Sequence, residues 1–268
     1  MSISVIMTVY NGMPHLKSSI ESVIGQTYKD EIEFIVINDC SDDGSSQLLD
    51  KYENKIDWIK VIHRNKKGRV DALNMALDVA KHKYISNIDA DDIWLPELLD
   101  FFVKTMENNE NIHLAGSGWY DWFEEGQLSK VTISTDLEKI RKFMARGSPF
   151  LHSAVIYRRK SALSVGGYRN FIAAIDLDLW IRLAEKYKIK AIPENLAINR
   201  RHKEQIFASK TPRNSLLRSH YEVKKEAIER LNLPFYYYFY PISIYAYTFL
   251  PRILQKPVRK MLGQKFES

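Results

Sequence analysis

Two aspartates, Asp89 and Asp91, are separated by one residue and lie at the end of the predicted strand Tyr84–Ile88. Two carboxylates at the point where a chain leaves a sheet can share a hard divalent cation. Mg²⁺ or Mn²⁺ held in this way keeps coordination positions open for phosphate oxygens. The alternative is an acidic loop in which Asp92 caps a helix that begins near Pro96 and the other two acids are solvated. The pair therefore predicts either a metal-assisted phosphate site or a structural loop.

The elements that would position these acids alternate between strand and helix over the first hundred residues. In chain order they are predicted at Ile3–Val9, Pro14–Ile24, Glu33–Ile37, Gln47–Tyr52, Ile59–Ile62, Val70–Ala80 and Tyr84–Ile88. Such alternation predicts a parallel sheet with helices on both faces, and ligands of these sheets bind beyond the carboxyl ends of the strands. Polar clusters follow three of the predicted strands: Thr8 with Tyr10 and Asn11, then Asp39, then Asp89 with Asp91.

The second half of the chain is less regular. It has predicted strands at Ala154–Tyr157 and Lys190–Ile192, and predicted helices at Leu137–Ala145 and Leu177–Lys186. Residues 212–231 predict a charged amphipathic helix. Residues 233–250 then contain no charged residue but 9 of the 27 Phe and Tyr residues, so the composition changes at about residue 209.

The charge of the chain is unevenly distributed. The net +6 arises in residues 199–268, which hold 14 Lys and Arg against 5 Asp and Glu, whereas residues 1–198 hold 25 against 28. The apolar content of 45% excludes a largely disordered chain. The single cysteine, Cys40, cannot form an intrachain disulfide, which favours a reducing compartment. No positive charge precedes Lys17, so the N-terminal stretch is predicted to be a strand and not a secretory signal.

Several motifs in order along the chain resemble the family-2 inverting glycosyltransferases of the GT-A fold, of the kind that build bacterial polysaccharides and lipopolysaccharides. These motifs are Ser4–Gly12, Phe34–Asp39 with Ser41–Ser45, Tyr84–Asp92, Gly166–Tyr168 and Asp176–Trp180. The resemblance covers about residues 1–205. It implies an α/β fold with a Rossmann-like, mostly parallel sheet flanked by helices. It also implies a GT-A catalytic domain over 1–208, with a nucleotide-sugar half at about 1–110 and an acceptor half at about 111–208. A helical, aromatic-rich extension would occupy 209–268.

The resemblance implies roles for the residues after the first and fourth strands. Thr8 and Tyr10, with Asn11 beside them, correspond to nucleotide-contacting positions of the family. Asp89 would contact the ribose or the metal-bound waters, and Asp91 would ligate the metal directly.

Two further residues correspond to nucleotide-contacting positions. Asp39 matches the acid that contacts the base edge, typically that of uracil, and its alternative role is an Asx-turn residue. Arg69 matches a basic position, and its alternative role is a solvated member of the basic run at residues 66–69.

The resemblance also implies candidate residues in the second half. His202 corresponds to a late position that can reach the metal or diphosphate, and Arg200 and Arg201 could help to hold phosphate by charge-assisted hydrogen bonds. His152 lies where the family often lines the sugar or acceptor pocket, with a satisfied buried histidine as the alternative. Trp180 is a further candidate for that pocket.

The catalytic base of the family lies in a Glu-Asp pair that opens a helix. This chain has Ile175 and Asp176 there, so the resemblance assigns Asp176 as the base, while Asp178 is expected to be structural. One in-line displacement needs a carboxylate that accepts the proton of the acceptor hydroxyl. A metal at Asp91 would stabilise the departing diphosphate.

The aromatic segment near the C-terminus allows three interpretations. Residues 231–251 are uncharged and long enough to span a bilayer, but Pro234, Pro241 and Pro251 interrupt them and six tyrosines favour the membrane–water interface. Attachment of residues 232–268 to an anionic membrane surface is therefore preferred, because basic residues flank the segment. Packing onto the catalytic domain, or onto a second subunit in a homo-oligomer, is the other alternative.

The sequence predicts a metal-dependent inverting glycosyltransferase, of hexosyl or N-acetylhexosaminyl type, that uses Mn²⁺ or Mg²⁺. It would move a sugar from a nucleotide-sugar, a UDP-sugar, to a glycan or lipid-linked acceptor in the cytoplasm, at the inner face of the membrane and without nucleic acid. A sugar-phosphate nucleotidylyltransferase is less favoured, because the loop Thr8–Pro14 has one glycine and no basic residue. A non-enzymatic basic protein that binds membrane or nucleic acid is the remaining alternative.

Overall fold

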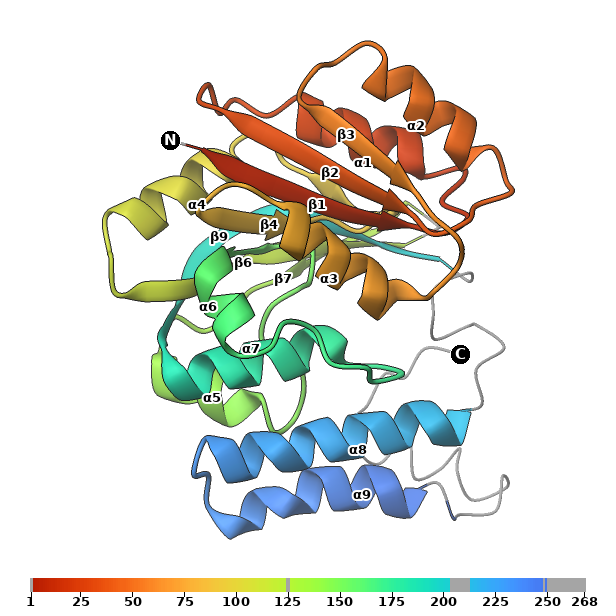
Figure 1. Cartoon of the computed structure of the whole chain (residues 1–268). Helices are drawn as coiled ribbons and strands as arrows, with labels where there is room; N and C mark the ends of the chain where they lie inside the picture. The colour runs from red at the N-terminus through yellow and green to blue at the C-terminus, as the bar shows by residue number, and fades with distance from the viewer. Residues whose placement is uncertain (1, 124–125, 203–212, 248, 250–268) are drawn as a thin grey trace.

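The computed structural model describes residues 2–123, 126–202, 213–247 and 249 (Figure 1). The strands in these residues are β1 (Ile3–Val9), β2 (Ile32–Asn38), β3 (Ile59–His63), β4 (Tyr84–Asn87), β5 (Ile93–Trp94), β6 (Ile112–Phe123), β7 (Leu128–Val131), β8 (Val155–Arg158) and β9 (Lys188–Arg201). The helices are α1 (Leu16–Ile24), α2 (Ser45–Glu53), α3 (Arg69–Val79), α4 (Leu98–Glu107), α5 (Leu137–Phe143), α6 (Arg159–Ser164), α7 (Ile175–Lys186), α8 (Arg213–Arg230), the 3₁₀ turn η2 (Phe235–Tyr238) and α9 (Phe239–Tyr247).

The strands form one nine-stranded sheet in the order β3-β2-β1-β4-β8-β6-β9-β5, with β7 beside β6. The first four strands of this order are parallel, as the alternation of strands and helices predicts. Beyond β4 the pairs are antiparallel except for β6 with β9. Among these pairs, only β6 and β7 are joined by a short hairpin connection, which requires antiparallel pairing. The α/β class is confirmed, with a mixed sheet flanked by helices.

Helices cover both faces of the sheet. Successive strand residues alternate between two cores, so Ile6 and Ile35 pack with α3 and α7, whereas Val5 and Phe34 pack with α1 and α4. This alternation follows from the two-residue period of side chains along a strand. The β1–β2 register pairs Val9 with Asn38, which brings the carboxyl ends of these strands to one edge of the sheet.

The long strand β6 was not predicted, and β9 was predicted only in part. The prediction for β9 covers only Lys190–Ile192, because Pro193 and polar residues interrupt the apolar pattern. Shifts of the β6–β9 register near Ser117 and Gly118 accommodate these residues. Gly116 of β6 is required by packing, since a Cβ there would lie 2.3 Å from the Phe150 ring.

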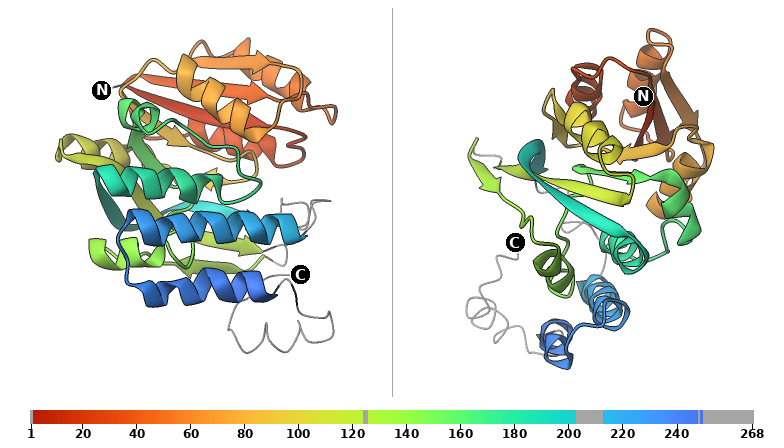
Figure 2. Two further views of the ribbon diagram at one scale, coloured as in Figure 1. Left: turned by 60° about the horizontal axis from the view of Figure 1, so that its bottom comes forward. Right: turned by 90° about the vertical axis from the view of Figure 1, so that its left-hand side faces the viewer.

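Helices α7, α8 and α9 follow one another away from the sheet (Figures 1 and 2). Helix α8 shares the core of α7 through Val223 and Ala227, and it confirms the predicted helix over residues 213–230. No helix among the described residues combines the length and the apolar content that crossing a bilayer requires. The predicted boundary at 208/209 and the basic residues beyond 250 lie outside the described residues.

Helix α9 and the η2 turn before it leave one side uncovered. Tyr237 and Ile244 are buried, whereas Phe235, Phe239, Ile242 and Phe249 are 84, 64, 52 and 72% exposed. Phe239 and Ile242 belong to α9, Phe235 to the preceding η2 turn, and Phe249 follows the helix; these four exposed side chains are called the α9 apolar face.

Candidate active site

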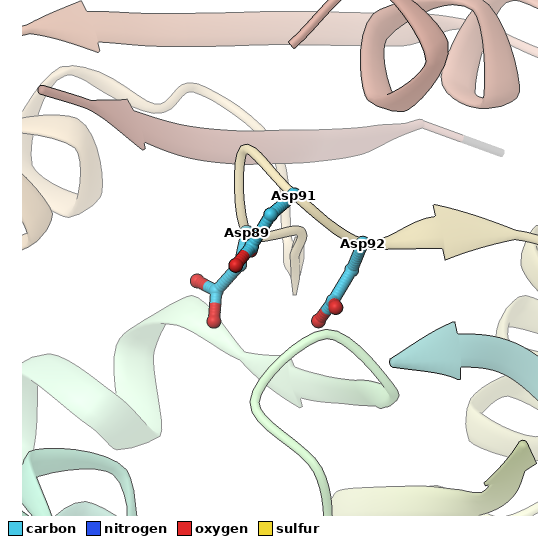
Figure 3. Close-up of side chains that lie close together, drawn as sticks. All are labelled: Asp89, Asp91 and Asp92. Atoms are coloured by element: carbon cyan, nitrogen blue, oxygen red, sulfur yellow. The ribbon is translucent and has the colours of Figure 1, made fainter. Parts of the chain in front are cut away.

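Three acids converge in the turn between β4 and β5. Carboxylate oxygens of Asp89, Asp91 and Asp92 lie within 4.8 Å of one another, and the side chains project to the same side of the turn (Figure 3). Asp92 is buried and accepts hydrogen bonds from Ser153 Oγ at 2.5 Å and from the backbone N–H of Arg200 at 3.1 Å. Burial, followed by the charges of Asp91 and Asp89, raises the pKa of Asp92 well above its usual value. The alternative of Asp92 as a helix cap is therefore wrong.

Asp89 is held by two basic side chains. Arg69 Nη2 donates to Asp89 Oδ1 at 2.5 Å, and His152 Nδ1 lies 2.9 Å from the same oxygen. The backbone N–H of Asp89 also donates to Ser153 Oγ at 2.9 Å. Although burial opposes the charged form, Arg69 and His152 hold the pKa of Asp89 well below its usual range. Arg69 is thus not a freely solvated residue, and no group among the described residues bonds its buried Nε.

His152 differs from the pocket-lining residue that the resemblance implies. It is 6% exposed, and both ring nitrogens have partners, because Nε2 lies 3.3 Å from the Tyr168 hydroxyl. His152 is the satisfied buried histidine of the alternative, and it supports Asp89 from behind.

Asp91 and His202 lie close enough together to share a divalent cation. Asp91 Oδ2 lies 2.9 Å from His202 Nε2, and the side chains are 28% and 15% exposed. Two ligands bound at about 2.1 Å to one ion and about 90° apart are about 3 Å from each other, so this spacing fits a shared ion. Asp89 lies beside them but is already paired with Arg69.

Asp39, at the end of β2, is buried and fixes the loop before α3. It accepts hydrogen bonds from the backbone N–H groups of Lys67 and Gly68 at 3.0 and 2.9 Å, and from Arg64 Nε at 2.8 Å. Burial opposes its charged form, but these donors lower its pKa. The Asx turn of the loop after β2 is made instead by Asp43, whose Oδ1 accepts from the N–H of Ser45 at 3.0 Å. Asp39 therefore helps to position the start of α3, where Arg69 lies.

The loop after β1 is tied to the loop after β2. Asn11 has φ 53°, and its carboxamide exchanges two hydrogen bonds with Asp42, at 2.8 and 3.0 Å. Tyr10 is 50% exposed and carries the Lys66 ammonium 3.5 Å from its ring centre. Thr8 is half-buried in β1 opposite Ile37. These contacts bring all three predicted nucleotide residues to the same edge as Asp39.

Asp176 occupies the first turn of α7 and is half-buried. Its charge is close enough to raise the pKa values of Arg69 and of the Tyr168 hydroxyl, so Asp176 lies near the cluster around Asp89. Asp178 points elsewhere, since it is 1% exposed and paired with Arg169 and Arg182. The expectation of a structural Asp178 is confirmed.

Trp180 is a correction to the sequence prediction. Its side chain is fully buried, with its ring centre 5.6 Å from that of Tyr157. It packs in the core between α7 and the sheet, so its ring is not open to a donor or acceptor.

The ends of β6 and β9 carry a polar network that the sequence analysis missed. Arg201 donates to Asp121 from Nε at 3.0 Å and Nη2 at 3.2 Å, and Asn199 Nδ2 donates to the same carboxylate at 2.9 Å. The Arg200 guanidinium lies 4.7 Å from the Trp122 ring centre. The sequence feature that could have indicated this network is the Trp-Tyr-Asp-Trp run at 119–122. It can be interpreted only once β6 is recognised as a strand that pairs with β9.

Comparison with known proteins decides the family. The sequence profile described as Glycosyl transferase family 2 matches residues 4–166. The chain belongs to glycosyl transferase family 2. An uncharacterized glycosyltransferase of Methanocaldococcus jannaschii, MJ1057, is 30% identical over 94% of this chain and 92% of its own length. The O-antigen biosynthesis glycosyltransferase WbnJ of Escherichia coli is 29% identical over 68% of this chain and 71% of its own.

Solved structures share the fold at low sequence identity. S. aureus TarS 1–349 in complex with UDP-GlcNAc has a TM-score of 0.70 at 19% identity, covering 92% of this chain and 71% of TarS. The mannosyltransferase PcManGT of Pyrobaculum calidifontis, in complex with GDP-Man and Mn²⁺, has a TM-score of 0.64 at 17% identity, covering 97% and 79%. The protein is therefore a glycosyltransferase, and the nucleotidylyltransferase and non-enzymatic alternatives are set aside.

Proposed function

We propose that this glycosyltransferase moves a sugar from a UDP-sugar to a hydroxyl group of a glycan or lipid-linked oligosaccharide, with inversion and with a divalent cation. The observation that carries the proposal is the convergence of Asp91 and His202, the Arg69–Asp89 pair and Asp176 at one edge of the sheet. The UDP-GlcNAc held by TarS and the O-antigen pathway named for WbnJ support the donor class and a role in surface polysaccharide synthesis.

Asp91 and His202 would hold Mn²⁺ or Mg²⁺, and the Mn²⁺ bound by PcManGT supports a metal in this fold. The bound cation would supply a Lewis acid for the departing diphosphate. Arg69 would add positive charge beside the departing diphosphate. Its buried Nε, which has no partner among the described residues, would be free to donate a hydrogen bond to it. Thr8, Tyr10, Asn11 and Asp39 would contact the nucleoside from the ends of β1 and β2.

Asp176 would accept the proton of the acceptor hydroxyl while the new bond from that oxygen to the anomeric carbon forms and the bond to diphosphate breaks. One displacement inverts the anomeric centre, so no covalent sugar–enzyme intermediate is required. Arg201, partly exposed beside Asp121, is proposed to contact the donor or acceptor.

A donor screen tests the chemistry without a known acceptor. The protein is incubated with Mn²⁺ and a panel of UDP-sugars and GDP-sugars, and release of nucleoside diphosphate is followed. A UDP-sugar is expected to give the highest rate, with loss of activity on chelation. Preference for a GDP-sugar would overturn the donor assignment, and undiminished release in excess chelator would overturn metal dependence. Proton NMR of a transfer product would decide between inversion and retention at the anomeric carbon.

We also propose that the protein is peripheral at the cytoplasmic membrane face through residues 232–268. The α9 apolar face supports this, since large contiguous apolar surfaces are rarely left in water. The uncharged segment is followed in sequence by Arg252, Lys256, Arg259, Lys260 and Lys265, which suit an anionic lipid surface.

Vesicle sedimentation tests the membrane proposal on the full chain. Binding is expected to vesicles that contain phosphatidylglycerol, to weaken with salt, and to be much lower with phosphatidylcholine alone. Equal and negligible sedimentation with both would overturn it. If the protein binds neither kind of vesicle, an increase in its molecular mass with protein concentration would indicate that the α9 apolar face forms a homo-oligomer contact.

A further inference from the structure

We propose that Ser219 of helix α8 is a positioning residue for Asp176, an inference that rests on the proposed role of Asp176 as the base. The Ser219 hydroxyl accepts a hydrogen bond from the N–H of Ala173 at 3.1 Å and donates one to the carbonyl oxygen of Ala173 at 2.8 Å. Both residues are buried, at 6% and 8% exposure. One side chain thus satisfies both backbone groups of a residue three positions before the base.

The backbone at this point needs external support. Ala174, the residue before α7, has φ 60° and ψ 30°, which is unfavourable for a residue with a Cβ. The N–H and C=O groups of Ala173 would also be buried without partners if the serine hydroxyl were removed. The conformation that begins α7 therefore depends on Ser219.

Helix α8 is a firm support because it is bonded to α7 at a second place. Glu226 of α8 accepts hydrogen bonds from Arg169 at 2.7 Å and from Arg230 at 2.9 Å, and Arg169 also pairs with Asp178 of α7. Val223 and Ala227 of α8 lie in the same core as α7. A shift of α8 relative to α7 would break both connections.

This arrangement extends the catalytic unit beyond the matched residues 4–166. The proposed nucleotide contacts lie after β1, β2 and β4, whereas Ser219 acts only on the segment before α7. Loss of its hydroxyl should therefore impair turnover and leave nucleotide binding intact. Displacement of a reacting group by about 1 Å can cost roughly 100-fold in rate.

The test compares Ser219→Ala with Ser219→Thr, which keeps a hydroxyl, and with Ser215→Ala, which removes a half-buried hydroxyl one turn earlier on the same helix. We measure kcat for nucleoside diphosphate release from the best donor of the screen, and the Kd of UDP with Mn²⁺ by calorimetry. For Ser219→Ala we expect kcat to fall about 10- to 100-fold and the Kd to change less than about twofold. Ser219→Thr should recover most of the rate, and Ser215→Ala should match the wild type.

A kcat for Ser219→Ala within twofold of the wild type would overturn the inference, as would a loss of UDP affinity equal to the loss of kcat. If Ser219→Ala does not fold, Ser219→Cys is measured instead, since a thiol has a similar volume but forms only weak hydrogen bonds. A wild-type kcat for Ser219→Cys would likewise overturn the inference. Asp176→Asn is measured in parallel. An active Asp176→Asn would refute the proposed base itself, whereas an inactive Asp176→Asn beside an active Ser219→Ala refutes only the role of Ser219.

Discussion

The loops after β1, β2 and β4 and the helices α8 and α9 expose very different groups. In the loops the charged side chains have partners within the protein: Asp39 with Arg64, Asp89 with Arg69, and Asp91 with His202. On α9 the exposed groups are the large apolar side chains of the α9 apolar face. The contrast indicates that the polar site is preorganised, because its groups are oriented before a ligand binds, whereas the described residues leave the α9 apolar face exposed.

The largest expected effect is at the centre of the polar site. Asp91→Asn should lower nucleotide-sugar turnover at least about 100-fold, because the amide removes the negative charge that would bind the cation. The melting temperature should change little, since Asp91 is partly exposed. Steady-state release of nucleoside diphosphate measures the first effect, and Asp78→Asn, an exposed acid on α3, is the control. Turnover within fivefold of the wild type would show that the polar site works without this carboxylate.

A second variant tests whether the site loops depend on one another. Asp39→Asn should weaken UDP binding about 10- to 100-fold and lower the free energy of unfolding by about 1–3 kcal/mol, because Arg64 and two backbone donors lose a charged acceptor. The pKa of Asp39 is lowered on folding, so its contribution to stability is present above pH 3.8, the unfolded value, and is lost as the pH falls further. Calorimetry and urea unfolding measure the two effects, with exposed Asp57→Asn as the control. Unchanged UDP affinity would remove Asp39 from the nucleotide site.

A substitution in the α9 apolar face should weaken vesicle binding and leave turnover unchanged, unlike the substitutions in the polar site. Phe239→Ser should lower binding to phosphatidylglycerol vesicles about 10-fold, because one buried phenylalanine contributes about 2 kcal/mol. Soluble turnover and stability should remain near the wild-type values, since Phe239 is 64% exposed. Vesicle sedimentation and urea unfolding check these expectations, with Leu128→Ser on β7 as an exposed apolar control. A large loss of stability without loss of vesicle binding would mean that this side chain supports the fold instead.

The smallest effect on activity is expected for Lys224, a buried residue of α8. Burial lowers its pKa from 10.5 to about 8. Between these values the unfolded chain binds more protons than the folded chain, so stability rises with pH, and the cost of the buried charge is fully present below about pH 8. Lys224→Met should therefore raise the free energy of unfolding by about 1–3 kcal/mol at pH 7, with a smaller difference near pH 10. Urea unfolding at both pH values tests this against Lys225→Met, a partly exposed neighbour; a pH-independent difference would exclude the charge as its cause.

The sequence predicted the parallel half of the fold well because its signals are local. The short apolar, β-branched runs of β1 and β2 and the apolar spacing of α1 and α3 lie within single elements. The same logic failed for β6 and β9, where the partners of polar and glycine residues are remote in sequence. Asn195, for example, reads as a turn residue, but its amide donates to the carbonyl of Val131, 64 residues away.

The candidate site shows the same difference between what local sequence predicts and what distant contacts decide. The residue types and their positions after predicted strands identified Asp39, Asp89 and Asp91 as chemically capable groups, and the resemblance to the family added Asp176. Only the tertiary structure decided their partners, because the contacts of Asp89 with His152, of Asp91 with His202 and of Ala173 with Ser219 join residues 63, 111 and 46 positions apart. Trp180, predicted to line the pocket, packs in the core instead. Local periodicity specifies which segments form and which groups can react, whereas the free energy that orients those groups comes from contacts that exist only when distant segments meet.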